Sequence, residues 1–183
     1  GPGATGILYL KQGAETKVDG YWPINSSLNT AASFLSLQFQ MQYIGNDNYP
    51  AKRALVDSCR MWDEIGRKRI EQYVLGLSSL CKRRLLQTFG EQGVLYSPDV
   101  PELSSGLTTF NPFVDQTDEG QLTNFRDRMR EEYGFVIRTT DFKVSAGDTE
   151  ETHALRISTH LFHDEKDVVN LVDAMYDLYR DMT

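Results

Sequence analysis

The order of apolar periodicities over residues 67–183 is the feature that most restricts the fold of this chain. Segments with helical spacing of apolar residues alternate with short segments typical of strands, in the order helix, strand, strand, helix, strand, strand, helix. Successive strands between helices favour an antiparallel or mixed sheet with helices packed on one face. We therefore expect an α/β chain whose residues 67–183 form an α+β layer domain.

The bounds of these elements follow from their caps and turns. Helices are predicted over residues 67–89, from a cap at Thr117 to a stop at Gly134, and from about Asp164 onward. Strands are predicted over residues 93–97, 106–110, 135–138 and 154–158. Apolar residues share one face of the helix 67–89. The apolar faces expected to point inward include two others: Leu122, Phe125, Met129 and Tyr133; and Val168, Leu171, Val172, Met175, Leu178 and Tyr179.

Residues before 50 do not fit into the pattern of the 67–183 unit. A strand is predicted at residues 7–10, and residues 36–43 alternate polar and apolar side chains as a half-buried strand does. The polar stretch 18–48 around it is long for a compact domain, which suggests a binding or interface loop. Asn48 and Pro50 predict a helix start, and Gly66 interrupts that helix. We divide the chain into residues 1–49, 50–66 and 67–183.

Composition argues against several classes of function. With 26 Asp+Glu against 19 Lys+Arg, the net charge of -7 opposes binding to a phosphate backbone. The basic run Lys82-Arg83-Arg84 is expected on a solvated helix face. No apolar run approaches the roughly 18 residues that a membrane helix needs. We expect a soluble, cytoplasmic protein, without nucleic-acid or membrane partners.

The cysteines and histidines indicate neither a disulfide framework nor a metal site. The chain has 2 cysteines, Cys59 and Cys81, which fall in separate predicted helices and are expected to be free thiols. His160 and His163 are three positions apart at a strand-to-helix turn, and no third ligand lies nearby in the sequence. We assign no metal ligand.

Arg156 is the first candidate binding residue. Side chains alternate along a strand, so Leu155 and Ile157 face one way while Arg156 and Ser158 face the other. Two interpretations of Arg156 remain open. The guanidinium pairs with a structural carboxylate, or it binds a substrate carboxylate through two parallel hydrogen bonds.

The segment 43–48 is the second candidate. It lies just before a predicted helix and contains Gly45 and Asn46, so its backbone N–H groups are placed to bind an anion. The alternative is a plain turn in which an asparagine side chain caps the helix.

These segments occur in an order that resembles the C-terminal part of class V pyridoxal-phosphate enzymes of the aminotransferase superfamily. The isopenicillin N epimerase-like and cysteine lyase-like branch is the most similar. Residues 1–9 resemble the Gly-rich turn and last strand of the large domain, residues 43–47 the family's Gly-Thr loop, and residues 54–66 the connecting helix. Residues 155–160, Leu-Arg-Ile-Ser-Thr-His, resemble the signature that contains the substrate-binding arginine.

The resemblance implies a fold-type-I architecture with pyridoxal 5'-phosphate as cofactor. Gly45 and Asn46 would bind the cofactor phosphate of a neighbouring subunit, although Asn46 stands where the family usually has Thr. Arg156 would hold the α-carboxylate of an amino-acid substrate. Residues 1–49 would then be the end of the large domain with its cofactor loop, and residues 67–183 the small C-terminal domain.

The resemblance also implies that the chain does not act alone. The Schiff-base lysine of the family should precede Gly1, so we assign no catalytic residue here and expect a homo- or hetero-oligomer with a chain that carries the lysine-containing half. C–S lyase or epimerase activity fits this branch, and an aminotransferase remains possible. The alternative is a non-catalytic binding or regulatory module that retains the small-domain fold.

Overall fold

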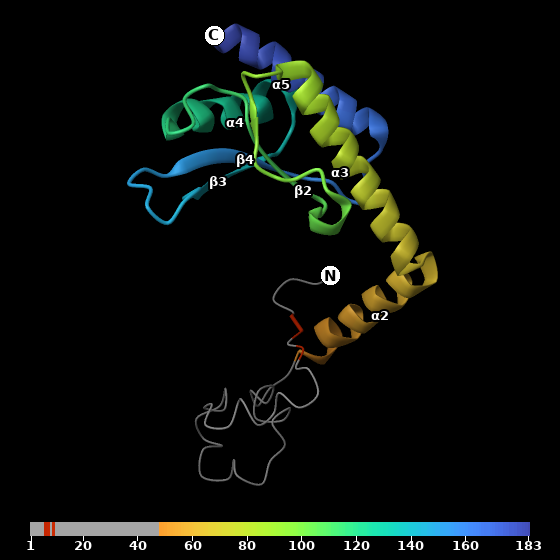
Figure 1. Cartoon of the computed structure of the whole chain (residues 1–183). Coiled ribbons are helices and arrows are strands. Elements are labelled where there is room, and N and C mark those ends of the chain that lie inside the picture. Colours follow the sequence, from red (N-terminus) through yellow and green to blue (C-terminus); the bar gives the residue numbers. More distant parts are fainter. Residues whose placement is uncertain (1–5, 8, 10–47) are drawn as a thin grey trace, which may run out of the picture. The chain divides into compact units, whose positions relative to one another are not determined.

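The computed structural model describes residues 6, 7, 9 and 48–183, and the chain divides into two units, Gly1–Ile65 and Gly66–Thr183 (Figure 1). In the first unit, helix α2 (Tyr49–Ile65) begins as predicted, because the backbone N–H of Ala51 donates to Asn48 Oδ1 over 3.1 Å. The helix ends before Gly66, whose φ of 95° is unfavourable for other residues. The strands predicted at 7–10 and 36–43 fall wholly or partly outside the described residues.

The second unit has the predicted order of elements. Helix α3 (Arg67–Phe89) leads to strand β1 (Val94–Leu95), the short 3-10 helix η4 (Pro101–Leu103) and strand β2 (Leu107–Asn111). Helix α4 (Glu119–Tyr133), strands β3 (Arg138–Phe142) and β4 (Thr152–Ser158), and helix α5 (Glu165–Met182) follow. None of the helices in the described ranges is long and apolar enough to cross a membrane.

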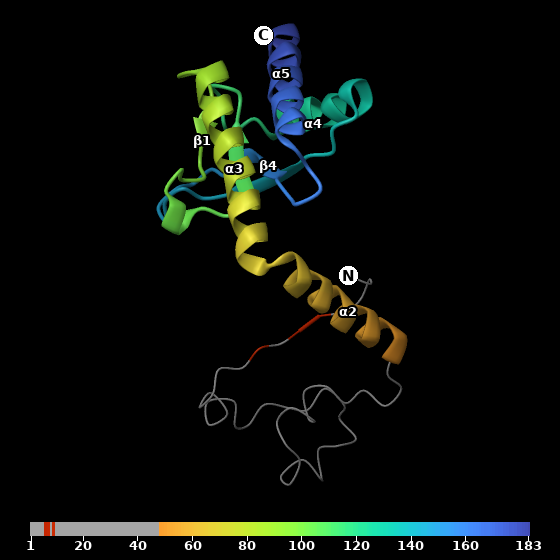
Figure 2. The ribbon, with the colours of Figure 1, turned by 90° about the vertical axis from the view of Figure 1, so that its right-hand side faces the viewer.

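The four strands of this unit form one sheet in the order β1-β2-β4-β3. Every neighbouring pair is antiparallel, which decides between the two sheet types that the sequence left open. Helices α4 and α5 lie on one side of the sheet (Figures 1 and 2), and α3 packs against α5 and β2. The α+β layer arrangement with helices on one face is therefore confirmed.

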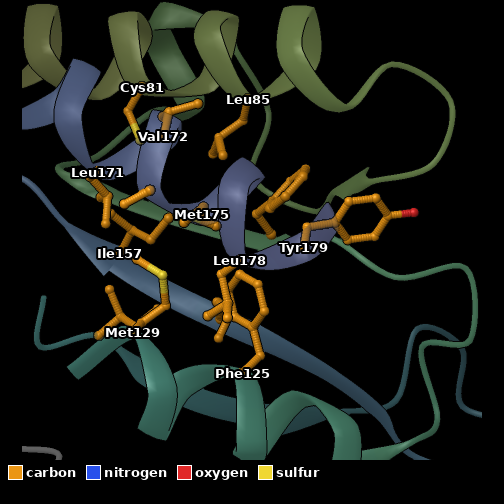
Figure 3. Close-up of a cluster of buried hydrophobic side chains, with 14 of the residues drawn as sticks. Cys81, Leu85, Phe125, Met129, Ile157, Leu171, Val172, Met175, Leu178 and Tyr179 are labelled. Atoms are coloured by element: carbon orange, nitrogen blue, oxygen red, sulfur yellow. The ribbon is translucent and has the colours of Figure 1, made fainter. Parts of the chain in front are cut away.

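The core lies between these helices and the sheet (Figure 3). All six residues predicted to face inward from α5 are buried. Cys81 and Leu85 are buried as well, and they project from α3 toward α5. Phe89 joins the end of α3 to the sheet and to α5, with ring centroids 5.1 Å from Phe110 and 5.5 Å from Tyr179. Burial of these apolar side chains is the main term that stabilises the unit.

The strand predicted at residues 135–138 is displaced along the chain. Gly134 ends α4 in the left-handed conformation, and the N–H of Phe135 donates back to Met129 O over 3.1 Å. Residues directly after the helix therefore still close its last turn. Strand β3 starts only at Arg138, where the predicted strand stops.

Two further expectations about α4 were wrong. The cap is Asp118, whose Oδ1 accepts from the N–H of Gln121 over 2.8 Å, whereas Thr117 bonds to Asp115. Tyr133, expected on the inner face, is 39% exposed because α4 ends at this residue.

Lys82 contradicts the expectation that its basic run is solvated. Its side chain is fully buried, and Nζ donates to Pro98 O over 2.7 Å and to Ser104 Oγ over 3.1 Å. The reason is that the loop around η4 folds back over α3 and places these oxygens beside the helix.

Candidate functional site

Arg156 lies in the middle of β4, on the face of the sheet opposite the helices. Its neighbours Leu155 and Ile157 are buried in the core, whereas Arg156 itself is exposed. The predicted alternation of side chains is therefore confirmed. In the antiparallel register, Arg156 is flanked by Thr109 of β2 and Arg138 of β3.

The two arginines form a like-charged pair across β3 and β4. Residues directly opposite each other in antiparallel strands have Cβ atoms about 4.5–5.5 Å apart, and like charges at these positions are destabilising. Both Arg138 and Arg156 are exposed. We call the row Thr109, Arg156 and Arg138, with Ser158 beside it, the arginine row.

Neither guanidinium of the arginine row forms an ion pair within residues 48–183. Other arginines of the same unit do: Arg126 Nη2 lies 2.7 Å from Asp127 Oδ1, and Arg128 Nη2 lies 2.7 Å from Asp181 Oδ2. The interpretation of Arg156 as one half of a structural ion pair is therefore not supported in the described part of the chain. Arg130 of α4 is likewise exposed and without an ion pair among these residues, so the interpretation of Arg156 as a binding residue stays a hypothesis.

Hydroxyl groups and one apolar side chain complete this end of the sheet face. Thr109 is half-buried and Ser158 is exposed, so both hydroxyls can add hydrogen bonds to a ligand held by the arginines. Leu107, paired with Ser158, is exposed. The set combines positive charge, hydroxyl donors and an apolar surface.

Two aromatic residues occupy a different part of the same face. The ring centroids of Tyr96, which follows β1, and Phe142 of β3 lie 5.0 Å apart in an edge-to-face arrangement. The Tyr96 hydroxyl donates to Gln116 Oε1, and burial raises the pKa of this phenol above its ordinary value. The aromatic contact thus links the two edge strands of the sheet.

Hydrogen bonds hold the turn after β4 and so fix where this strand ends. The N–H of His160 donates to His163 Nδ1 over 3.0 Å, and the Tyr73 hydroxyl donates to His163 O over 2.7 Å. Asp164 and Asp167 then exchange side-chain and backbone hydrogen bonds, each of 2.9 Å, in a capping box that starts α5. The two histidines lie at the predicted strand-to-helix turn.

The other predicted site residues, Gly45 and Asn46, lie outside the described residues. Conversely, Arg138 was not identified from the sequence as a site residue. The sequence signal for Arg138 was a basic residue at the end of a predicted strand. Its position opposite Arg156 depends on an antiparallel register, which local sequence patterns do not reveal.

No protein-family model matches this chain, and no curated protein matches it significantly. The residues themselves are therefore the basis for a functional interpretation.

Proposed function

We propose that this chain is the C-terminal part of a fold-type-I pyridoxal-phosphate enzyme that acts on an amino acid, and that Arg156 binds the substrate α-carboxylate. The observation that carries the proposal is an exposed arginine in the predicted signature strand, without an ion-pair partner among residues 48–183. An unpaired guanidinium offers a carboxylate two parallel, charge-assisted hydrogen bonds.

Within this proposal, Arg156 orients the substrate. Holding the α-carboxylate at a fixed strand position restricts rotation about the Cα–N bond of the substrate, and so determines which Cα bond faces the reacting centre. The core residues Leu155 and Ile157 anchor the strand on its other face. Pyridoxal phosphate, when bound, supplies the electron sink for breaking a bond at Cα.

The rest of the proposal concerns groups that the described residues do not contain. Gly45 and Asn46 are proposed to bind the cofactor phosphate, and a partner chain is proposed to supply the Schiff-base lysine in a homo- or hetero-oligomer. C–S lyase and epimerase are the favoured reactions, with aminotransferase as a third. The free thiols of Cys59 and Cys81 support a cytoplasmic location.

The carboxylate role of Arg156 is tested in the assembly of this chain with the chain that co-purifies with it. Arg156→Ala is expected to lower kcat/KM for the amino acid by roughly a hundredfold, mainly through KM, because two charge-assisted hydrogen bonds are lost. Arg130→Ala, at an exposed position of α4, is the matched control and should change neither constant. An unchanged kcat/KM in Arg156→Ala would exclude the role.

The alternative function is a non-catalytic binding or regulatory module with the same domain fold. The two are separated by adding pyridoxal phosphate to the complete assembly and recording its visible absorption spectrum. A Schiff-base band supports the enzyme. Its absence, together with carboxylate binding that depends on Arg156, would favour the module.

A further inference from the structure

We propose that Arg138 is a second anion-binding residue, and that the arginine row selects a substrate carrying a side-chain carboxylate in addition to its α-carboxylate. This inference rests on the proposed role of Arg156. It adds the chemical class of the substrate, which no sequence motif indicated.

The first support is the register of β3 and β4. Arg138 is the residue directly paired with Arg156, so the two side chains leave the sheet on the same face, which is opposite to the buried face that carries Leu155 and Ile157. Two long side chains that start from adjacent positions can bring their guanidinium groups to the two carboxylates of one small diacid. Each guanidinium can then bind one carboxylate of the same molecule.

The second support is the balance of charge. Two exposed arginines are directly paired across β3 and β4, and no carboxylate forms an ion pair with either one in the described part of the chain. A monoanionic ligand compensates one of these charges, whereas a dianionic ligand compensates both. The repulsion within the pair is thereby converted into a preference for the dianion.

The third support is the way in which strand β3 carries Arg138. Its side chain is exposed, and the other face of the strand packs on α4. Its head group is therefore available while its backbone is fixed, which is the arrangement that a specificity residue requires.

The experiment compares succinate with propionate as probes of the full 183-residue chain. They correspond to aspartate and alanine without the amino group, whose positive charge would oppose binding to arginines in the absence of cofactor. Binding is followed at constant ionic strength through the NMR signals of the arginine Nε–H groups. We expect succinate to bind about tenfold more tightly than propionate, from one added charge-assisted carboxylate contact.

Three variants assign the preference to residues. Arg138→Gln is expected to remove the advantage of succinate and leave propionate binding intact, whereas Arg156→Gln weakens both. Arg130→Gln, on α4, is the control that changes neither. Arg138→Lys keeps the charge without the planar fork and should retain only part of the preference; it also replaces Arg138→Gln if that variant fails to fold.

The outcomes separate this inference from the function on which it rests. If Arg156→Gln weakens both probes but Arg138→Gln changes nothing, the second anion site is overturned and the role of Arg156 stands. If neither probe binds, the second anion site is overturned, and the role of Arg156 is decided by kcat/KM in the complete assembly. If sulfate binds as tightly as succinate, the row attracts dianions by charge alone and the assigned substrate class is wrong.

Discussion

At the scale of single residues, Lys82 links helix α3 to the loop that contains η4. Its stem is fully buried, and its ammonium group donates to one backbone oxygen and one hydroxyl of that loop. Burying a charge is costly unless hydrogen bonds satisfy it. The two bonds therefore keep the loop against the helix.

Removing this side chain should destabilise the protein markedly. Lys82→Ala loses both hydrogen bonds and leaves a void where the stem packed, so we expect the free energy of unfolding to fall by about 3 kcal/mol. The neighbouring Arg83→Ala, at an exposed position, should change it by less than about 0.5 kcal/mol. Urea unfolding of the two variants provides the comparison, and equal stabilities would contradict the structural role of Lys82.

The buried thiol of Cys81 makes the free energy of unfolding depend on pH in the alkaline range. Burial raises its pKa from 9.0 to about 12, against opposing effects of Thr108 and Lys82. Between these values the unfolded chain loses the proton and the folded chain retains it. The free energy of unfolding is therefore unaffected below the lower value and decreases as pH rises from 9 to 12.

This linkage can be isolated with two cysteine variants. From about pH 8 to about pH 10, the Cys81 contribution should lower the free energy of unfolding by about 1 kcal/mol. Cys81→Ala should lose that part of the pH dependence, whereas Cys59→Ala, at an exposed position, should keep it. Identical pH profiles for the three proteins would show that Cys81 does not carry the effect.

Sequence patterns predicted the role of a residue where that role depends on residues close to it in the chain. Asn48 caps α2 as expected, and Asp164 begins α5, because capping depends only on the next few residues. Lys82 was placed wrongly since its partners are supplied by a loop that follows α3 in the sequence. Arg138 was missed for the same physical reason: its neighbour Arg156 comes from another strand.

At the scale of elements, Gly106 allows α3, β2 and the end of β4 to meet. A Cβ at this position would lie 2.7 Å from Val74 Cγ1 and 3.0 Å from Thr159 O. The N–H of Thr159 also donates to Gly106 O over 2.8 Å, so neither neighbour can move away without breaking a contact. The short branched side chain of Val74 leaves little room for adjustment.

We therefore expect Gly106→Ala to lower the free energy of unfolding by about 2 kcal/mol through overpacking. Gly147→Ala is the matched control, because no heavy atom lies within 4 Å of its added Cβ. Thermal unfolding of both variants tests the prediction. A Gly106→Ala variant as stable as its control would show that the junction can relax.

Element types were easier to predict than their ends. Apolar periodicity gave the helices and the number of strands, since both depend on spacing along the chain. Strand β3 was displaced because the closing turn of α4 extends past Gly134, and no periodic signal marks where such a turn stops.

At the scale of the whole molecule, residues 66–183 contain their own sheet and core. Of the residues that the structure describes, all four strands and every member of the buried hydrophobic cluster belong to this range. A fragment consisting of residues 66–183 is therefore expected to fold without the first unit. Cooperative thermal unfolding, followed by near- and far-ultraviolet circular dichroism, would show this. A fragment with secondary structure but no near-ultraviolet signal would contradict it.

The layer architecture could be predicted from the sequence, but the strand order could not. Alternating helices and strand pairs imply helices on a sheet, whichever strands are neighbours. The order β1-β2-β4-β3 depends on contacts between segments far apart in the chain. The arginine row is a product of that order, which is why only one of its two guanidinium groups was identified beforehand.

The central position of β4 has a consequence for how fast this domain can form. Its pairing with β3 spans only the short connection between them, whereas its pairing with β2 joins residues 107–110 to residues 155–158. The pairing of β2 with β4 must close a loop that contains α4 and β3. The conformational entropy of this loop is lost before the contacts between β2 and β4 can stabilise the chain. We expect the β2–β4 pairing to limit the folding rate, so the arginine row would be assembled in full only in the last stage of folding.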